Sequence, residues 1–318
     1  MQDLTYQFEV IRAIRNFFEV HSFTEVLTPP AVENPGMETH IHPFQLFHKN
    51  QNKIAEMYLH TSPEFHMKEI LAHHPKLNDI YTLSYCFRDE PISDIHRSQF
   101  LMLEWYRKNQ RYEKIMDDTS SLVKYTQDHL DQFGILKNKI TSFPHVTIAD
   151  LFKEYTSVDI LNYLDTNELK EMIATDFKDV PLPSIDCSWD DYFFLLFLNK
   201  VEPHLKNHPY LLINEFPAPL SALSTIKEDD ERVCERFEVY LHGVELSNSF
   251  NELTDFKTLK KRFEIQAAEK KSLYGYELPW PETFMKMMEQ GYPRSAGIAL
   301  GVERLLYSLT NVENPFFK

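Results

Sequence analysis

Hydrophobic residues recur at helical spacing near the start of the chain, at Leu4, Phe8, Ile11, Ile14 and Phe18. An apolar residue at every third or fourth position covers one face of a helix, so this pattern predicts an amphipathic helix over residues 3–21. The next eight residues, "FTEVLTPP", alternate as a strand does and end at two prolines, which cannot donate a ladder hydrogen bond. We therefore expect a helix followed by a short strand.

Two aromatic, apolar stretches flank a charged segment in "YTLSYCFRDEPISDIHRSQFLMLEWYRK", residues 81–108. This pattern predicts two strands joined by a loop of about eight residues, which is longer than a tight hairpin requires. Just before it, "LHTSPEFHMKEIL" reads as the end of a strand and then a helix. We expect Ser62 to cap that helix and Pro63 to lie in its first turn.

Residues 111–210 become helical and irregular, and we interpret them as an all-helical insertion within a single domain that spans residues 1–318. Strand character returns at 210–217 and at 235–253, where the pattern predicts a hairpin that turns at His242 and Gly243. The chain then has helical patterns at 255–272 and 281–291, and a strand that runs into a helix over 295–309. This order favours an α+β domain around one mainly antiparallel sheet.

Charge and composition narrow the possible partners and locations. The chain has 318 residues, 43% of them hydrophobic, and a formal net charge of −15, which argues against nucleic acid as the main partner because phosphate contacts need a basic face. No apolar run is long enough to cross a bilayer, and the N-terminus lacks a secretory signal. The three cysteines are far apart and show no metal spacing, which favours a reduced, cytoplasmic protein. For Cys86 a packed core thiol is favoured over a nucleophile.

Several charged residues and glycines indicate chemistry. The strand carboxylates Glu238, Glu245 and Glu252 are each ordinary alone, but together in one cleft they would suit a divalent cation and an ammonium group. Arg88 and Arg304 could hold phosphates, since a guanidinium binds phosphate oxygens in a bidentate manner. Glycines in "GIALGVER" predict a ligand close to the backbone. Neither phosphate-loop pattern, GxxxxGK[ST] or GxGxxG, occurs.

These strings together resemble a known family. "FTEVLTPP" resembles motif 1 of the class II aminoacyl-tRNA synthetases, "FRDE…HRSQF" motif 2, and "GIALGVERL" motif 3. With "TSPEFHMK", "MLEWYR" and "RFEVYLHGVELSNSFNELTD" they resemble the lysine-specific catalytic domain, over nearly the whole chain and in the right order. The resemblance implies a mainly antiparallel sheet flanked by helices, the use of ATP and Mg²⁺, and a homodimer formed through motif 1.

One difference from the tRNA-charging enzymes narrows the resemblance. Those enzymes carry an anticodon-binding barrel before motif 1, whereas motif 1 begins here close to Met1, so we expect no anticodon binding. A catalytic domain of this length resembles the elongation factor P–lysine ligase family, and Ala299 stands where the tRNA-charging enzymes usually have glycine. That family activates lysine or (R)-β-lysine as an aminoacyl-adenylate and transfers it to a lysine of elongation factor P.

The resemblance also implies roles for single residues in ATP binding. Arg88 would bind the α-phosphate and the substrate carboxylate, and Arg304 would cover the adenine and hold the γ-phosphate; these two would be the catalytic residues. The other residues expected at the nucleotide are Glu90, His96, Arg97, Phe100, Glu238, Val239 and Gly301. Glu238 and Glu245 would hold Mg²⁺.

For the amino-acid substrate the resemblance implies a pocket of acidic and hydroxyl groups. Ser62 and Glu64 would meet the amino group, Tyr106 and Glu252 would bind the ε-ammonium, and Glu245 and Ala299 would lie nearby. A carboxylate beside a phenol suits this ion, because an unpaired ammonium in a closed pocket is costly.

Some positions depart from the family pattern and leave two alternatives open. The usual H-N-P-E-F of motif 2 is His96-Arg97-Ser98-Gln99-Phe100 here, and the usual N-G-F is Asn248-Ser249-Phe250. One alternative is therefore a synthetase paralogue that loads another acceptor. The other is a non-catalytic regulator with a synthetase fold, although every motif arginine and metal carboxylate is present.

Overall fold

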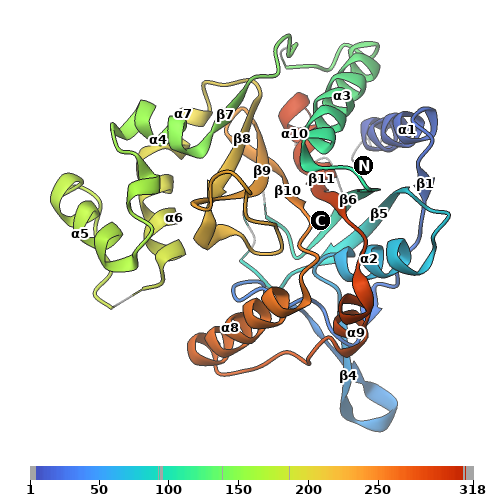
Figure 1. Ribbon diagram of the computed structural model, residues 1–318. Coiled ribbons are helices and arrows are strands. Elements are labelled where there is room, and N and C mark those ends of the chain that lie inside the picture. Colours follow the sequence, from blue (N-terminus) through green and yellow to red (C-terminus); the bar gives the residue numbers. More distant parts are fainter. Residues whose placement is uncertain are drawn as a thin grey trace.

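The computed structural model describes residues 5–91, 93, 96–137, 139–185, 187–310 and 312. Its centre is an eight-stranded sheet with the strand order β1-β5-β6-β11-β10-β9-β8-β7 (Figure 1). In that order the strands are Thr24–Glu25, Asp79–Phe87, Gln99–Lys108, Ser295–Gly301, Val244–Asn251, Val233–Leu241, Leu211–Pro217 and His145–Thr147. All neighbours are antiparallel except the two edge pairs, β1 with β5 and β7 with β8. The predicted mainly antiparallel sheet is confirmed.

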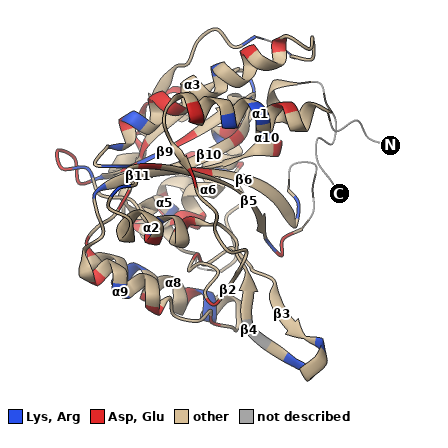
Figure 2. Cartoon of the chain, turned by 90° about the vertical axis from the view of Figure 1, so that its right-hand side faces the viewer, with Lys and Arg blue, Asp and Glu red and all other residues tan. Residues whose placement is uncertain are grey.

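One face of the sheet is covered by α1 (Thr5–Val20), α3 (Tyr112–Asp131) and α10 (Val302–Leu309), which lie on the same side in Figure 2. The apolar stripe of α1 lies in this core, where the ring of Phe18 stacks on Tyr81 at a centroid distance of 4.4 Å and packs against Trp105. The helix predicted over residues 3–21 is confirmed within the described residues, and Val10, Ile14, Phe17 and Phe18 are buried against the sheet, whereas Phe8 is exposed.

The opposite face is covered by α2 (Glu64–His73), α8 (Phe256–Tyr274) and α9 (Glu282–Gly291). These helices share a second core in which Phe65 stacks on Phe284 at 4.1 Å. A small sheet of β2 (Ala31–Val32), β3 (Gln45–His48) and β4 (Lys53–Leu59), with the 3₁₀ turn η1 (Lys49–Gln51) between β3 and β4, extends from the body in both views. The helices predicted at 255–272 and 281–291 are confirmed.

The segment 111–210 is mostly helical, as predicted, but it is neither wholly helical nor wholly separate. Its first helix, α3, packs in the main core, and β7 pairs with β8 as an edge strand. A three-residue strand is too short for its alternation to be recognised, which is why it was missed. The remaining elements form their own core against β8: α4 (Ile148–Thr156), η2 (Ile160–Asn162), α5 (Thr166–Asp176), α6 (Trp189–Lys200) and α7 (Glu202–Leu205).

Two local predictions have different outcomes. The hairpin turn is confirmed: β9 ends at Leu241, β10 begins at Val244, and His242 and Gly243 both have positive φ, 50° and 81°. The cap of α2 is shifted by one residue, because Pro63 and not Ser62 precedes the first helical residue. Ser62 Oγ nevertheless accepts the N–H of Glu64 at 3.0 Å.

None of the described helices is both long and apolar enough to cross a bilayer.

Cys86 is fully buried, and burial raises the pKa of its thiol well above the usual value, so the packed core thiol expected from the sequence is confirmed.

Candidate functional site

A cavity of about 1730 Å³ lies on the face of the sheet opposite α1 and α3. Its walls come from the strands β6, β10 and β11 and the residues that follow β5. The segment 37–41, the start of α2, one side of α8, the start of α6, the turn η3 (Ala218–Leu220) and the start of α10 complete them. The volume exceeds that of a typical small-molecule site, which leaves room for two ligands. The sequence-predicted residues that line it are Ser62, Glu64, Arg88, Glu90, His96, Arg97, Phe100, Tyr106, Glu245, Glu252, Ala299, Gly301 and Arg304.

Arg88 and Phe100 form one side of the cavity, at the open ends of β5 and β6. The pairing of Cys86 with Phe100 across these strands places Arg88 just beyond the ladder, with its guanidinium 5.1 Å from the Phe100 ring centroid. Arg88 Nε also donates to the carbonyl of Thr61 at 3.4 Å. The guanidinium is thus oriented from two sides. Residues 92, 94 and 95 of the predicted motif 2 loop, including Asp94, lie outside the described residues.

Arg304 joins three parts of the chain at the rim of the cavity. Its Nη1 donates to the backbone carbonyl of Glu245 at 2.8 Å, and its Nη2 donates to Nε2 of His96 at 3.2 Å. The neighbouring Glu303, which sequence reasoning missed, accepts the N–H of Leu101 at 2.6 Å, and burial raises its pKa to about 7. The start of α10 is thereby fixed to β6, which sets the position of Arg304.

The two carboxylates predicted to hold a metal differ in exposure. Glu245 lines the cavity, whereas Glu238 is buried behind it and accepts from Arg236 Nη2 at 2.6 Å and from the Tyr240 hydroxyl at 2.9 Å. Burial raises the pKa of Glu238, Arg236 lowers it, and Glu245 raises it again, so the two carboxylates lie close enough to interact. Val239 does not line the cavity, because its side chain is buried in the core on the other face.

The inner end of the cavity contains a buried ion triad. Lys68 Nζ lies 2.6 Å from Glu64 Oε1 and 2.6 Å from Glu252 Oε2. Burial alone would lower the pKa of Lys68, but Glu252 and Glu64 outweigh it and raise the pKa, so the lysine stays protonated. The sequence analysis did not predict a role for Lys68. Its spacing of four residues from Glu64, on the helix face that packs against the core, is the feature that could have indicated one.

Glu104 is a second residue that sequence reasoning missed. It lies fully buried on β6 and accepts from the Ser62 hydroxyl at 2.7 Å and the Tyr106 hydroxyl at 3.3 Å. Burial raises its pKa to about 8, and Glu64 contributes to the rise. The feature that could have indicated a role for Glu104 is its position between Leu103 and Trp105, as an acidic residue in an otherwise apolar part of the strand. Lys68 and Glu104 are therefore both ionisable groups of the inner pocket that the sequence did not predict.

Gly297 leaves space for the ring of Tyr106. A Cβ added at Gly297 would lie 2.2 Å from Tyr106 Cε1 and 2.8 Å from Glu252 Oε1. The residues face each other across the paired strands β11 and β6. We predicted that a ligand lies close to the backbone at this glycine. The group that lies there is the ring of Tyr106, and the missing Cβ of Gly297 allows that ring its position.

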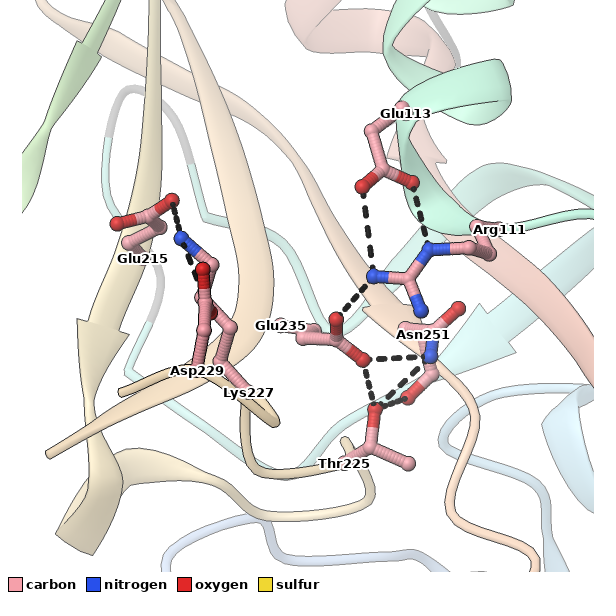
Figure 3. Close-up of polar contacts among 8 residues, drawn as sticks. All are labelled: Arg111, Glu113, Glu215, Thr225, Lys227, Asp229, Glu235 and Asn251. Carbon is pink, nitrogen blue, oxygen red and sulfur yellow. Dashed lines mark hydrogen bonds and ion pairs between the residues drawn. The ribbon is translucent and has the colours of Figure 1, made fainter. Parts of the chain in front are cut away.

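A polar network holds the strand end that carries Glu252 (Figure 3). Glu235 accepts from Thr225 Oγ1 at 2.5 Å and from Asn251 Nδ2 at 2.7 Å, and it forms an ion pair with Arg111 at the start of α3. Thr225 N–H also donates to the carbonyl of Asn251. Since Asn251 precedes Glu252, this network fixes the wall of the inner pocket.

Comparisons with known proteins agree with this geometry. The family described as tRNA synthetases class II (D, K and N) matches residues 1–314. A curated relative from Proteus mirabilis, named elongation factor P–(R)-β-lysine ligase, is 34% identical over 308 residues, which cover 96% of this chain and 90% of the relative. Proteins of the same name from Hamiltonella defensa (31% identical, 99% and 93% covered) and Edwardsiella ictaluri (34%, 96% and 90%) are similar over almost their full length.

Proposed function

This chain belongs to the class II tRNA synthetase (D, K and N) family, and from that premise we propose that it is an ATP-dependent ligase that activates (R)-β-lysine or lysine and attaches it to a lysine side chain of elongation factor P. One observation carries the proposal: a single cavity has two arginines at its outer part and a set of buried carboxylates at its inner end. Arginines suit a triphosphate, and carboxylates suit the ammonium groups of a diamino acid.

The first step requires two anions to meet. An oxygen of the substrate carboxylate attacks the α-phosphorus of ATP, the bond from that phosphorus to the bridging oxygen breaks, and pyrophosphate leaves. Since the carboxylate is already ionised, no general base is needed. Arg88 and Arg304 would neutralise the repulsion and align the partners, and such preorganised donors are worth about 10²–10³ in rate each.

The donor set at Glu245 and Glu238 fits a divalent cation. Oxygen ligands suit Mg²⁺, which neutralises phosphate charge when bound. The described residues contain no group of three or more His, Cys, Asp or Glu placed to hold a metal, so the nucleotide phosphates and water would supply the remaining ligands. Glu245 would contact the cation directly, with Glu238 held behind it by Arg236 and Tyr240.

The second step forms the amide bond. The neutral amine of the acceptor lysine attacks the carbonyl carbon of the aminoacyl-adenylate, the bond from that carbon to the phosphate oxygen breaks, and AMP leaves. The attacking nitrogen loses a proton to solvent. We place this step in the cytoplasm, because the free cysteines suit a reducing compartment.

We also propose that the chain acts as a homodimer through the outer face of α1 and the segment that follows it. Phe8, Val20 and Leu27 are 54%, 72% and 85% exposed there. Large apolar side chains that are this exposed are candidates for burial in an interface. Sedimentation equilibrium of the wild type and of Phe8→Glu tests this proposal: a dimer that becomes a monomer supports it, and a wild-type monomer at micromolar concentration contradicts it.

The decisive experiment separates activation from transfer. Purified protein with ATP and Mg²⁺ should exchange labelled pyrophosphate when (R)-β-lysine or lysine is added, and should then transfer the labelled amino acid to purified elongation factor P. No exchange with any lysine isomer would contradict the ligase proposal. Label on tRNA instead of on the protein would overturn the proposed acceptor.

A further inference from the structure

Glu38 lines the same cavity and lies near the arginine end of the amino-acid pocket. Its position follows from Gly36: a Cβ added there would lie 2.5 Å from Glu38 Oε2 and 3.2 Å from Thr61 Oγ1. The carboxylate thus packs over the bare α-carbon of Gly36, beside the chain segment that leads into Ser62. The carbonyl of Thr61 in turn accepts from Arg88 Nε. The segments that carry Glu38, Thr61 and Arg88 therefore lie close together in this part of the cavity.

The backbone holds the Glu38 carboxylate in place, and no ion pair does so. Burial and the charge of Glu64 raise the pKa of Glu38, and hydrogen bonds from the main chain of Glu38 and Met37, together with the more distant charge of Arg88, offset only part of that rise. Among the described residues no lysine, arginine or histidine lies within ion-pair distance of it. A desolvated carboxylate that is oriented but not neutralised is ready to bind a cation.

The other carboxylates of the inner pocket already have partners. Lys68 is paired with both Glu64 and Glu252 at 2.6 Å. Glu104 accepts two hydroxyl hydrogen bonds, from Ser62 and Tyr106. The substrate, a diamino acid, brings two ammonium groups into the pocket. Lys68 alone cannot balance the charges of all the carboxylates around it. Among the described carboxylates of the inner pocket, Glu38 has no ion pair and no side-chain donor, and Arg88 and Lys270 act on it only from beyond ion-pair distance.

We propose that Glu38 is a further specificity-determining residue, which binds the substrate amino group nearest the substrate carboxylate. This inference rests on the proposed function and extends it. The distal ammonium would lie at Tyr106, Glu104 and Glu252, whose charges act on one another. Glu38 instead interacts with Glu64 and Arg88, the residue proposed to hold the substrate carboxylate. An amino group on C2 or C3 is one or two bonds from that carboxylate and falls in the same region.

The test compares substrates that differ only in this amino group. 6-Aminohexanoate keeps the carboxylate and the distal ammonium of lysine and (R)-β-lysine but has no second amino group. In pyrophosphate exchange, Glu38→Gln should lower kcat/KM for the preferred lysine isomer by about tenfold to a hundredfold, the range for a lost hydrogen bond to a charged group. It should change kcat/KM for 6-aminohexanoate by less than about threefold. Glu38→Asp, which keeps the charge, should have an intermediate effect.

A matched control is Glu269→Gln, since Glu269 lines the same cavity but is bonded to Thr39 Oγ1 at 2.8 Å. It should change kcat/KM for both substrates by one common factor. Equal losses on both substrates in Glu38→Gln would overturn the inference, and so would normal exchange with a loss confined to transfer onto the acceptor. Calorimetric binding of lysine and of 6-aminohexanoate gives the same comparison without turnover. Failure of the proposed function would look different, because the wild type would then exchange with no lysine isomer.

Discussion

The ammonium of Lys68 lies 2.6 Å from the carboxylate of Glu252, and both side chains are almost completely buried. The sequence predicted that Glu252 binds the ammonium of the substrate, and that role stays a prediction. The structure adds that one of its oxygens already faces a cation of the chain itself. The substrate ammonium would therefore share Glu252 with Lys68 and draw on Glu104 and Tyr106 as well.

The first prediction concerns the stability of this buried pair. Lys68→Met leaves Glu64 and Glu252 buried without a cation, and breaking such a pair costs about 3–5 kcal/mol. Burial raises the pKa of Glu252 to about 7 even though Lys68 lowers it, so without Lys68 the pKa rises further. When folding raises the pKa of a carboxyl group, the folded protein loses stability as the pH rises above the pKa that the group has in the unfolded chain. Urea denaturation should show a larger loss at pH 8 than at pH 5.

Lys139→Met is the control for Lys68→Met. Lys139 is exposed and pairs with Asp131 and Asp128 at 3.2 and 3.4 Å, and solvent screens exposed pairs so that they contribute little to stability. Its loss should therefore be small at both pH values. A Lys68→Met protein that unfolds at the wild-type urea concentration would contradict the role of the triad.

The second prediction concerns proton release when the substrate binds. Burial raises the pKa of Glu104 to about 8, so this carboxyl group is mostly protonated at pH 7. An ammonium placed beside it favours the ionised form, and its proton leaves. Calorimetric titration with lysine in two buffers of different ionisation enthalpy should give a release approaching one proton at pH 7 and none at pH 9. Glu104→Gln should reduce the release to the part that Glu252, with a pKa raised by burial to about 7, contributes at pH 7. A release unchanged in Glu104→Gln would exclude this role for Glu104.

The architecture could be predicted from the sequence, and most of the predicted site residues line the cavity, because the strand patterns and the ordered motifs are strong signals. The alternating apolar stretches around Trp105 predict paired strands, and the three ordered motifs place Arg88 and Arg304 at one site. Lys68 and Glu104 could not be predicted, since a charged residue in an apolar context is informative only when its partner is known. Their partners, Glu252 and Ser62, are 184 and 42 positions away.

Glu238 illustrates the opposite case. It lies on the predicted strand, but the hydroxyl of Tyr240 and the guanidinium of Arg236 engage both of its oxygens. Residues two apart on a strand share a face, so the contacts are visible in the sequence afterwards. The sequence alone could not decide whether these neighbours or a metal would be the partner.

The third prediction concerns the space at Gly297. Gly297→Ala places a methyl group where Tyr106 Cε1 would be 2.2 Å away, so the ring must move out of the inner pocket. We expect KM for the lysine substrate to rise at least about tenfold, because one hydrogen bond to the charged ammonium is lost, while KM for ATP stays within a factor of about two. Leu300→Ala is the control, because Leu300 is on the same strand but is buried in the core and does not line the cavity; it should cost about 2–5 kcal/mol of stability and leave both KM values unchanged. Equal rises in both KM values would contradict this reading of Gly297.

The fourth prediction concerns the arginine that follows β5. Arg88→Ala removes the guanidinium that lies over Phe100 and is oriented by Thr61, so the phosphate and the substrate carboxylate lose one shared cation. We expect kcat/KM for pyrophosphate exchange to fall by about 10²–10³. Arg88→Lys should recover only part of this activity, because an ammonium cannot bind two anions in a planar, bidentate manner. Arg232→Ala is the control, since Arg232 is exposed and bonds to Asp230, and it should exchange at the wild-type rate. Full exchange activity in Arg88→Ala would remove the basis for every nucleotide assignment made at this end of the cavity.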